Sequence, residues 1–384
     1  MKKIAVVTGS RAEYGLLKNI LKMLQIDEDV ELCLIVTGAH LSEEFGNSKQ
    51  EIINDGFLIT REIISIDDSS GELSAASSIG IIIRECSEIF IEIKPDILLL
   101  LGDRFEILAA AISATLCHIP IAHIHGGEVT LGSMDDTFRH AITKMSHLHF
   151  AATKLARNRI IQMGEDPNRT YLVGGLGVDN LSTLKRLSRD ALEIKHGIKF
   201  SKRNLLVTYH PDTVQPKNSL EQFEELLAVL ELQKDSFLLF TAPNIDSGGQ
   251  ELLSRLRHFV ASNDNSVLIE SLGFEDYISI ASLSNAVIGN SSSGLLEIPS
   301  LGVGSINIGS RQSGREFASS VINCEPTKES ISSALIEILS DKFQESLKNT
   351  ENPYGTGGAS ESIYKVLKII NKEQLLSKPF VNIL

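Results

Sequence analysis

The sequence predicts an α/β protein made of two doubly wound domains, each with a parallel β-sheet covered by helices. Three observations support this prediction. The chain has 384 residues, more than a single hydrophobic core usually serves. Short runs rich in Val, Ile and Leu alternate with segments of helical period. The alternation is interrupted once, at residues 181–200, which are charged and have a helical pattern but no strand. We therefore expect a first domain over residues 1–180 and a second over residues 181–359.

Six strands are expected in the first half. The first four are short and almost unbroken apolar runs, which are typical of a parallel sheet buried on both faces, and the last two continue the alternation. The strands are Ile4–Thr8, Val30–Thr37, Asp96–Leu101, Ile119–His125, His147–Ala151 and Thr170–Val173. Segments long enough for crossover helices separate them, at Glu13–Leu24, Ala75–Ile93, Phe105–Leu116 and Thr137–Ser146. Right-handed crossovers of this kind produce a doubly wound sheet.

The second half repeats this order. Its expected strands are Asn204–Tyr209, Phe237–Phe240, Ser266–Ile269, Ala286–Ile288 and Gly304–Ile308. Its expected helices are Leu220–Leu232, Gln250–Ala261, Phe274–Leu283 and Gly294–Pro299. Residues 349–358 have the composition of a loop, and Ser360–Ile370 is expected to form a final helix. Ligands of open α/β sheets bind at the carboxyl ends of the strands, so the residues after each strand are the candidates for function.

The composition predicts a soluble protein of the cytoplasm. Basic residues number 36 and acidic residues 49, and the net charge of −13 disfavours nucleic acid and anionic membranes as partners. No apolar run approaches the roughly 18 residues of a membrane helix. The first three residues lead directly into a strand, which excludes a secretion signal. The four cysteines include no CxxC pair, as expected for reduced core residues.

Two motifs in the first half follow strands. Thr8–Gly15 opens a helix, where free amide groups and the Arg11 guanidinium favour an anion. This motif is neither GxGxxG nor a Walker loop, which argues against NAD and ATP. A tight turn with a surface arginine is an equally simple interpretation. Asp103 and Arg104 end an apolar strand, where Asp103 is suited to proton transfer or to capping the next helix.

Histidines and acids are concentrated farther along the first half. Six of the ten histidines lie within residues 118–149. His123 and His125 are two residues apart, so both are expected on one face of their strand. With nearby carboxylates they also suggest a metal-dependent hydrolase. The Gly126-Gly127 pair that follows favours a turn or a close approach to a ligand. The neighbouring acids are Glu128, Asp135 and Asp136.

The second half contains a predicted anion site. Gly289–Glu297 runs from a strand through three serines into a helix. Backbone amides, hydroxyl groups and the helix dipole together suit a diphosphate. Glu297, one turn into the helix, is placed to accept both hydroxyl groups of a ribose, whereas a serine-rich helix cap explains only one of the serines. His210 ends another strand, and Arg311 lies in a further loop.

Taken in order, these motifs resemble those of the hydrolysing UDP-N-acetylglucosamine 2-epimerases. More narrowly, they look like the bacterial enzymes that supply N-acetylmannosamine for sialic acid synthesis. The similar segments are TGSRAEYG, LGDR, HIHGGE, DDTFRHAITK, HPDT, PNID, GNSSSGLLE and GSRQSGR. The resemblance implies a GT-B fold, with two Rossmann-like domains facing a central cleft and the segment 360–384 completing the first domain. It also implies a homodimer or homotetramer, with neither a metal nor another cofactor.

The resemblance also implies a reaction. Family members convert UDP-N-acetylglucosamine and water to N-acetylmannosamine and UDP, by anti elimination of UDP and syn hydration of a 2-acetamidoglucal. Carried over by position, proton transfer falls to Asp103 and Asp135, with Glu128 and His125 as supporting candidates. The positions implied to bind UDP and the sugar are Arg11, Glu13, Arg104, His210, Asn290, Ser291, Ser292, Glu297 and Arg311.

The chain departs from this family at three places. Many relatives read HIEGGE, with an acid where this chain has His125, and the segment from Glu128 to Asp135 is one residue longer here. Glu13 replaces a frequent aspartate. These changes suggest a subgroup or a different sugar, such as the UDP-diacetamido-trideoxyhexose of legionaminic acid synthesis. The sequence is also compatible with a non-hydrolysing epimerase, a GT-B glycosyltransferase, a metal-dependent hydrolase or a non-catalytic sugar-nucleotide sensor.

Overall fold

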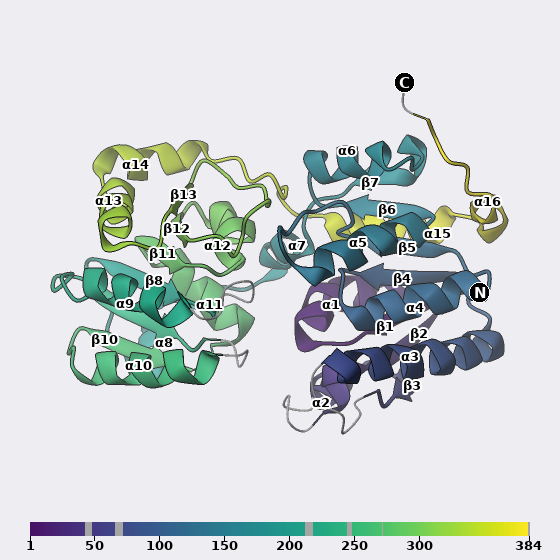
Figure 1. The fold of residues 1–384 in the computed structure, drawn as a ribbon, viewed down its shortest axis with the longest axis horizontal. Helices are drawn as coiled ribbons and strands as arrows, with labels where there is room; N and C mark the ends of the chain where they lie inside the picture. Colours follow the sequence, from purple (N-terminus) through teal and green to yellow (C-terminus); the bar gives the residue numbers. More distant parts are fainter. Residues whose placement is uncertain (43–47, 66–71, 212–217, 244–247, 271, 383–384) are drawn as a thin grey trace. The chain divides into compact units, whose positions relative to one another are not determined.

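The computed structural model describes residues 1–42, 48–65, 72–211, 218–243, 248–270 and 272–382. The chain forms two compact units, each built on one parallel sheet with helices on both faces (Figure 1). The first unit comprises Met1–Thr130, Met134–Asn180 and Gly357–Leu384, and the second comprises Leu131–Ser133 and Leu181–Thr356. Within the described residues, no helix combines the length and the apolar character required to cross a membrane.

The first sheet has seven parallel strands in the order β3-β2-β1-β4-β5-β6-β7. Their bounds are β1 Lys2–Thr8, β2 Val30–Thr37, β3 Ile59–Ile63, β4 Ile97–Leu101, β5 Ile121–Ile124, β6 Leu148–Ala151 and β7 Thr170–Leu172. Six of these strands confirm the sequence prediction to within a few residues. β3 was not predicted, because its sequence, ITREI, is a half-polar strand at the edge of the sheet rather than an apolar run.

Helices cover both faces of the first sheet, and strand alternation assigns each side chain to a face. Ile4 and Val6 of β1 pack into one core, whereas Ala5 and Val7 pack into the core on the opposite face. The first core contains side chains of α1 and α15, and the second contains those of α3 and α4. The helices are α1 Arg11–Ile26, α2 Lys49–Asn54, α3 Glu72–Ile93, α4 Phe105–Leu116, α5 Met134–Met145, α6 Lys154–Gln162, α7 Leu176–Thr183, α15 Ala359–Ile369 and α16 Lys372–Leu376.

The C-terminal segment belongs to the first unit. Ile363 and Leu367 of α15 are fully buried in the core that α1 also lines. The Lys2 ammonium, on β1, donates hydrogen bonds to the carbonyl oxygens of Leu367 at 2.8 Å and Ile370 at 2.5 Å, which lie at the carboxyl end of α15. A cation at this end of a helix satisfies free carbonyl groups and complements the helix dipole.

The second sheet has six parallel strands in the order β10-β9-β8-β11-β12-β13. Their bounds are β8 Asn204–Thr208, β9 Phe237–Thr241, β10 Ser266–Ile269, β11 Ala286–Gly289, β12 Gly304–Ile308 and β13 Val321–Cys324. Side chains of α9, α10 and α13 pack against one face, and those of α8 and α11 against the other. The helices are α8 Arg189–His196, α9 Ser219–Leu230, α10 Gly249–Ala261, α11 Gly273–Ser282, α12 Ser293–Leu296, α13 Lys328–Ile338 and α14 Asp341–Ser346.

In both sheets the order in which successive strands are added reverses next to the first strand. The reversal lies between β1 and β4 in the first unit and between β8 and β11 in the second. Such a switch point leaves a crevice at the carboxyl ends of the strands, where doubly wound sheets bind ligands. The predicted site residues follow β1, β4 and β5 in the first unit and β8, β11 and β12 in the second. Two of the family-like segments are described only in part. Residues 212–213 of HPDT and residues 244–246 of PNID lie outside the described residues.

Candidate active site

Arg139 binds two carboxylates and one backbone carbonyl group of the first unit. It lies on α5, is only 3% exposed, and donates from Nε to the Asp103 carboxylate at 2.8 Å, with a second bond from its terminal nitrogen. It also donates to the carbonyl oxygen of Glu128 at 2.9 Å and to the Asp136 carboxylate at 2.9 Å. Asp103 does not cap α4, whose N-cap residue is Arg104. One buried guanidinium therefore fixes the ends of β4 and β5 and the start of α5.

Asp135 lies within the electrostatic influence of these groups. Its pKa is raised because it is partly removed from water and because Asp103 is a nearby negative charge, while Arg104 and Arg139 oppose the shift. Arg104 forms a paired contact of 3.0 and 3.1 Å with the Glu106 carboxylate, which is fully buried. Asp103 and Arg104 are therefore close enough to Asp135 to change its protonation equilibrium, in opposite directions.

His125 and Glu128 form a pair after β5. The strand ends at Ile124, and His125 takes a left-handed backbone conformation with φ +62°. Its Nε2 accepts a hydrogen bond from the Leu176 amide at 3.3 Å, and its Nδ1 lies 4.0 Å from the Glu128 carboxylate. Because His125 leaves the strand, it does not share a face with His123, and the predicted two-histidine strand face is wrong.

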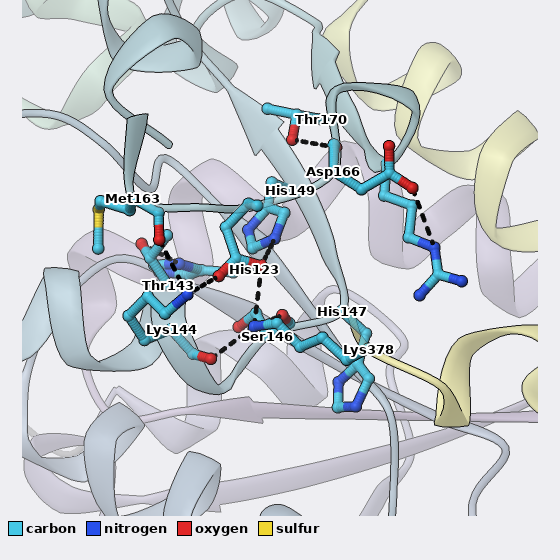
Figure 2. Close-up of polar contacts among 12 residues, drawn as sticks. His123, Thr143, Lys144, Ser146, His147, His149, Met163, Asp166, Thr170 and Lys378 are labelled. Atoms are coloured by element: carbon cyan, nitrogen blue, oxygen red, sulfur yellow. Dashed lines mark hydrogen bonds and ion pairs between the residues drawn. The ribbon is translucent and has the colours of Figure 1, made fainter. Parts of the chain in front are cut away.

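His123 supports the fold. Its ring is fully buried, and its Nε2 donates to the Gly102 carbonyl at 2.7 Å. Its Nδ1 lies 3.2 Å from the Thr143 hydroxyl (Figure 2). Burial lowers its pKa to about 3, so the ring is neutral at physiological pH. Both ring nitrogens are therefore engaged by protein groups. Among the residues that the structure describes, no three His, Cys, Asp or Glu side chains gather as a metal site requires.

The glycine pair after His125 is required by packing. Gly127 has φ +75°, and a Cβ there would lie 2.3 Å from the carbonyl oxygen of Ala156 on α6. A side chain at this position would therefore displace backbone. A Cβ at Gly126 would lie 2.8 Å from the Thr143 hydroxyl and 2.9 Å from Nδ1 of His123, so close packing surrounds both glycines.

After β1, the side chain of Arg11 is exposed to solvent, whereas that of Glu13 is buried. Arg11 is largely exposed and pairs with Glu51 at 2.9 Å. Glu13 is 8% exposed, and it accepts a hydrogen bond from the Gly9 amide at 2.8 Å. Burial raises the pKa of Glu13 to about 8, which keeps it protonated at neutral pH. Glu13 thus stabilises the turn at Gly9, which leads from β1 into α1.

Asn290 joins the loops of the second unit. Its side chain accepts a hydrogen bond from the His210 amide at 2.7 Å and donates to the His210 carbonyl at 2.8 Å, which ties β8 to β11. Its own carbonyl oxygen accepts from Arg311 at 3.1 Å and from Gln312 at 2.9 Å. Burial lowers the pKa of His210 to about 4, with Arg311 contributing, so this ring is neutral at physiological pH.

The serine loop follows directly. Gly289, the last residue of β11, has φ +141°, and a Cβ there would lie 1.8 Å from the carbonyl oxygen of Thr208. Ser291 accepts a hydrogen bond from the Ser293 amide at 3.4 Å, and Ser292 is the N-cap of α12. The prediction of one continuous helix from Gly294 is wrong, because α12 ends at Leu296 and a 3-10 turn follows.

Glu297 lies between α12 and that turn and is 8% exposed. Burial raises its pKa to about 7, against the effects of the Ser293 hydroxyl and the Arg315 charge. Ionised and protonated forms of Glu297 therefore coexist near neutral pH. A carboxylate at this position can accept hydrogen bonds from a diol.

Three residues that organise these sites had no role in the sequence prediction, namely Arg139, Glu106 and Gln312. One signal for Arg139 was available. It lies on the same face of its helix as Ile142 and Thr143, and all three are buried. A charged residue among buried positions usually has a partner. Glu106 and Gln312 carry no comparable signal, because their partners come from tertiary packing.

Known proteins resemble this chain along its whole length. A family model described as UDP-N-acetylglucosamine 2-epimerase matches residues 22–368. The GDP/UDP-N,N'-diacetylbacillosamine 2-epimerase (hydrolyzing) of Campylobacter jejuni is 37% identical over all of this chain and 99% of its own length. The UDP-N,N'-diacetylbacillosamine 2-epimerase (hydrolyzing) of Legionella pneumophila is also 37% identical, over 98% of this chain and 99% of its own.

Two further similarities complete the comparison. The polysialic acid biosynthesis protein P7 of Escherichia coli is 36% identical over 96% of this chain and 94% of its own length. The structure of the Methanocaldococcus jannaschii UDP-GlcNAc 2-epimerase, solved with UDP-GlcNAc and UDP, aligns with a TM-score of 0.76 and 21% identity, over 95% of this chain and 99% of that one. The chain belongs to the UDP-N-acetylglucosamine 2-epimerase family.

Proposed function

We propose that the protein is a hydrolysing 2-epimerase that acts on UDP-N,N'-diacetylbacillosamine, a UDP-linked diacetamido-trideoxyhexose. The observation that carries this proposal is the 37% identity, over nearly the whole chain, to two proteins named for this activity. The main substrate predicted from the sequence, UDP-N-acetylglucosamine, thus gives way to the diacetamido sugar. The reaction consumes one water and yields UDP and the free sugar inverted at carbon 2.

In this proposal, one group of residues binds UDP and another transfers protons. In the second unit, Ser291, Ser292 and Arg311 hold the diphosphate, and Glu297 accepts hydrogen bonds from the ribose hydroxyls. In the first unit, Asp103 and Asp135 transfer protons at carbon 2 during elimination and hydration. Stabilising the departing diphosphate is the larger demand of the elimination step, because negative charge develops there.

UDP-N-acetylglucosamine remains a second candidate, with N-acetylmannosamine as the product. The similarity to the polysialic acid biosynthesis protein favours it, because sialic acids are made from that product. The acid arrangement serves either sugar equally. The substituents at carbons 4 and 6 distinguish the two substrates, so a direct comparison of both decides between them.

The test is to incubate the purified protein with each UDP-sugar in heavy water and to identify the products by proton and phosphorus NMR. We expect UDP and a free sugar carrying deuterium at carbon 2, with kcat/KM at least about tenfold higher for the diacetamido sugar. An epimer still attached to UDP would indicate a non-hydrolysing enzyme. Absence of deuterium at carbon 2 would contradict epimerisation, and a higher kcat/KM for UDP-N-acetylglucosamine would contradict the substrate.

A further inference from the structure

We infer that His125 is a positioning residue, which holds Glu128 as a third catalytic carboxylate and does not itself exchange protons with the substrate. The inference rests on the proposed function and deepens it. It gives a role to the histidine that stands where many relatives carry an acid. The argument concerns only the first unit and begins with the two ring nitrogens of His125.

One ring nitrogen is already committed. Leu176 is the first residue of α7, and its amide belongs to the group that a helix leaves without an internal partner. That amide donates to Nε2 of His125 at 3.3 Å. An Nε2 that accepts a hydrogen bond carries no proton, so the neutral ring has its proton on Nδ1. His125 thus caps α7 and fixes its own tautomer.

The protonated nitrogen is directed at Glu128. Nδ1 lies 4.0 Å from the Glu128 carboxylate, and both side chains are mostly buried, at 19% and 13% exposed. This separation exceeds a direct hydrogen bond, but it is short enough for an electrostatic attraction between the Nδ1 proton and the carboxylate. The carbonyl oxygen of Glu128 also accepts from Arg139, the residue that holds Asp103. Glu128 is therefore tied to the acid group through its backbone and faces His125 through its side chain.

The backbone of His125 is strained in a way that serves this contact. Its φ of +62° is unusual for a residue with a side chain and is energetically unfavourable. Its amide still donates to the Phe150 carbonyl at 2.9 Å, so the turn is fixed by the neighbouring strand β6. Strain of this kind persists where the surrounding structure imposes it. Here it directs the ring to Leu176 and Glu128 instead of along the strand.

Three substitutions separate the two contacts. His125→Asn keeps a donor near the Nδ1 position but loses the acceptor for Leu176. His125→Gln keeps an acceptor near Nε2 and loses the donor to Glu128, and His125→Ala loses both. We expect kcat to fall about 10–100-fold in the Gln and Ala variants, with KM little changed, and to recover in part in the Asn variant. Because Asn also tolerates a positive φ, thermal unfolding of all three variants measures the effect of backbone strain separately.

A double-mutant cycle with Glu128→Gln identifies the route of the effect. If His125 acts through Glu128, adding His125→Ala to Glu128→Gln lowers kcat little further. Multiplicative losses, or near-normal kcat in His125→Ala, would overturn the inference. Turnover on the diacetamido sugar or on UDP-N-acetylglucosamine supplies this readout, so a wild-type protein that releases no UDP from either rejects the proposed function on its own.

A measurement without substrate decides the positioning even in that case. Ring nitrogen-15 NMR, with the His125→Gln spectrum for assignment, reports the tautomer of His125 directly. We expect a protonated Nδ1 and a bare Nε2, and a changed Nδ1 shift in Glu128→Gln. A proton on Nε2, or a ring spectrum that is indifferent to Glu128→Gln, would show that the contact does not exist in solution.

Discussion

At the scale of single residues, Asp103 and Asp136 both accept hydrogen bonds from one guanidinium group. Arg139 is almost fully buried and bonds to Asp103, to Asp136 and to the backbone of Glu128. A buried arginine in this position fixes geometry because its donors have set directions. Removing a carboxylate from it should therefore change the chemistry more than it changes nucleotide binding by residues of the second unit.

The Asp103→Asn variant tests that separation. We expect kcat to fall by a factor of about 10²–10⁴, the range associated with a lost proton-transfer group. The Kd for UDP, measured by calorimetry, should change less than about threefold, because the proposed UDP contacts lie on the second unit. Near-normal release of UDP and epimerised sugar would remove Asp103 from the proposed mechanism. A large loss of UDP affinity would show that the variant disturbs more than proton transfer.

Glu297 predicts a pH dependence of UDP binding. Its pKa is raised to about 7, so the side chain is mostly ionised at pH 8 and mostly protonated at pH 6. The ionised form accepts two hydrogen bonds from a ribose, and we expect its contribution to UDP affinity to fall about tenfold from pH 8 to pH 6. The phosphate groups of UDP also titrate, so the measurement is the ratio of wild-type to Glu297→Gln affinity at each pH. A ratio that stays constant would contradict the role of Glu297.

At the scale of elements, the sequence predicted the strands that contain an apolar run and missed two strands that are partly polar. α4 was predicted with the bounds Phe105–Leu116 that the structure has, and β2 likewise with Val30–Thr37. β3 and β13 were missed because edge strands are partly polar and lack an unbroken apolar run. The candidate loops were located correctly after their strands, whereas the contacts within them were not, because Arg139 and Asp103 are 36 residues apart and meet only through packing.

The junction of β8 and β11 predicts a sharp contrast between two glycines. Gly289→Ala places a Cβ 1.8 Å from the backbone of Thr208, whereas Gly302→Ala, also at positive φ, meets nothing within 4 Å. We expect Gly302→Ala to destabilise by about 1 kcal/mol from backbone strain alone. Gly289→Ala should cost several times more or prevent folding of the second unit. Soluble yield and thermal unfolding measure both, and equal effects would contradict the close contact of the two strands.

At the scale of the whole molecule, each unit is completed by its own packing. The first unit uses residues from both ends of the chain, with α15 and the segment beyond it packed against residues from its amino-terminal half. Lys378 donates to the carbonyl oxygens of Lys144 and Ser146 (Figure 2). It also pairs with the buried Glu165 at 2.9 Å. These contacts attach the C-terminal segment around Lys378 to the end of α5 and to the turn that precedes β6.

Replacing Lys378 by Met should lower the stability of the first unit. Glu165 would keep Lys144 and His149 as partners but lose one cation from a buried site, at a cost of about 1–3 kcal/mol. We expect a midpoint of thermal unfolding a few degrees lower. The control is Lys348→Met, which removes an exposed pair with Glu345 and should change little. Equal shifts for both variants would contradict the anchoring role of Lys378.

The return of the chain to its first unit has a consequence for protein synthesis. Residues 1–180 leave the ribosome with the surface that later receives Ala359, Ile363, Leu367 and Leu375 still open to water. The intervening residues 181–356 are made in the meantime and contain a complete sheet and core of their own. Domains generally fold as units when their residues are available. The second unit is thus able to fold before the first is complete. Until α15 has been synthesised, residues 1–180 remain incompletely packed and accessible to chaperones and proteases.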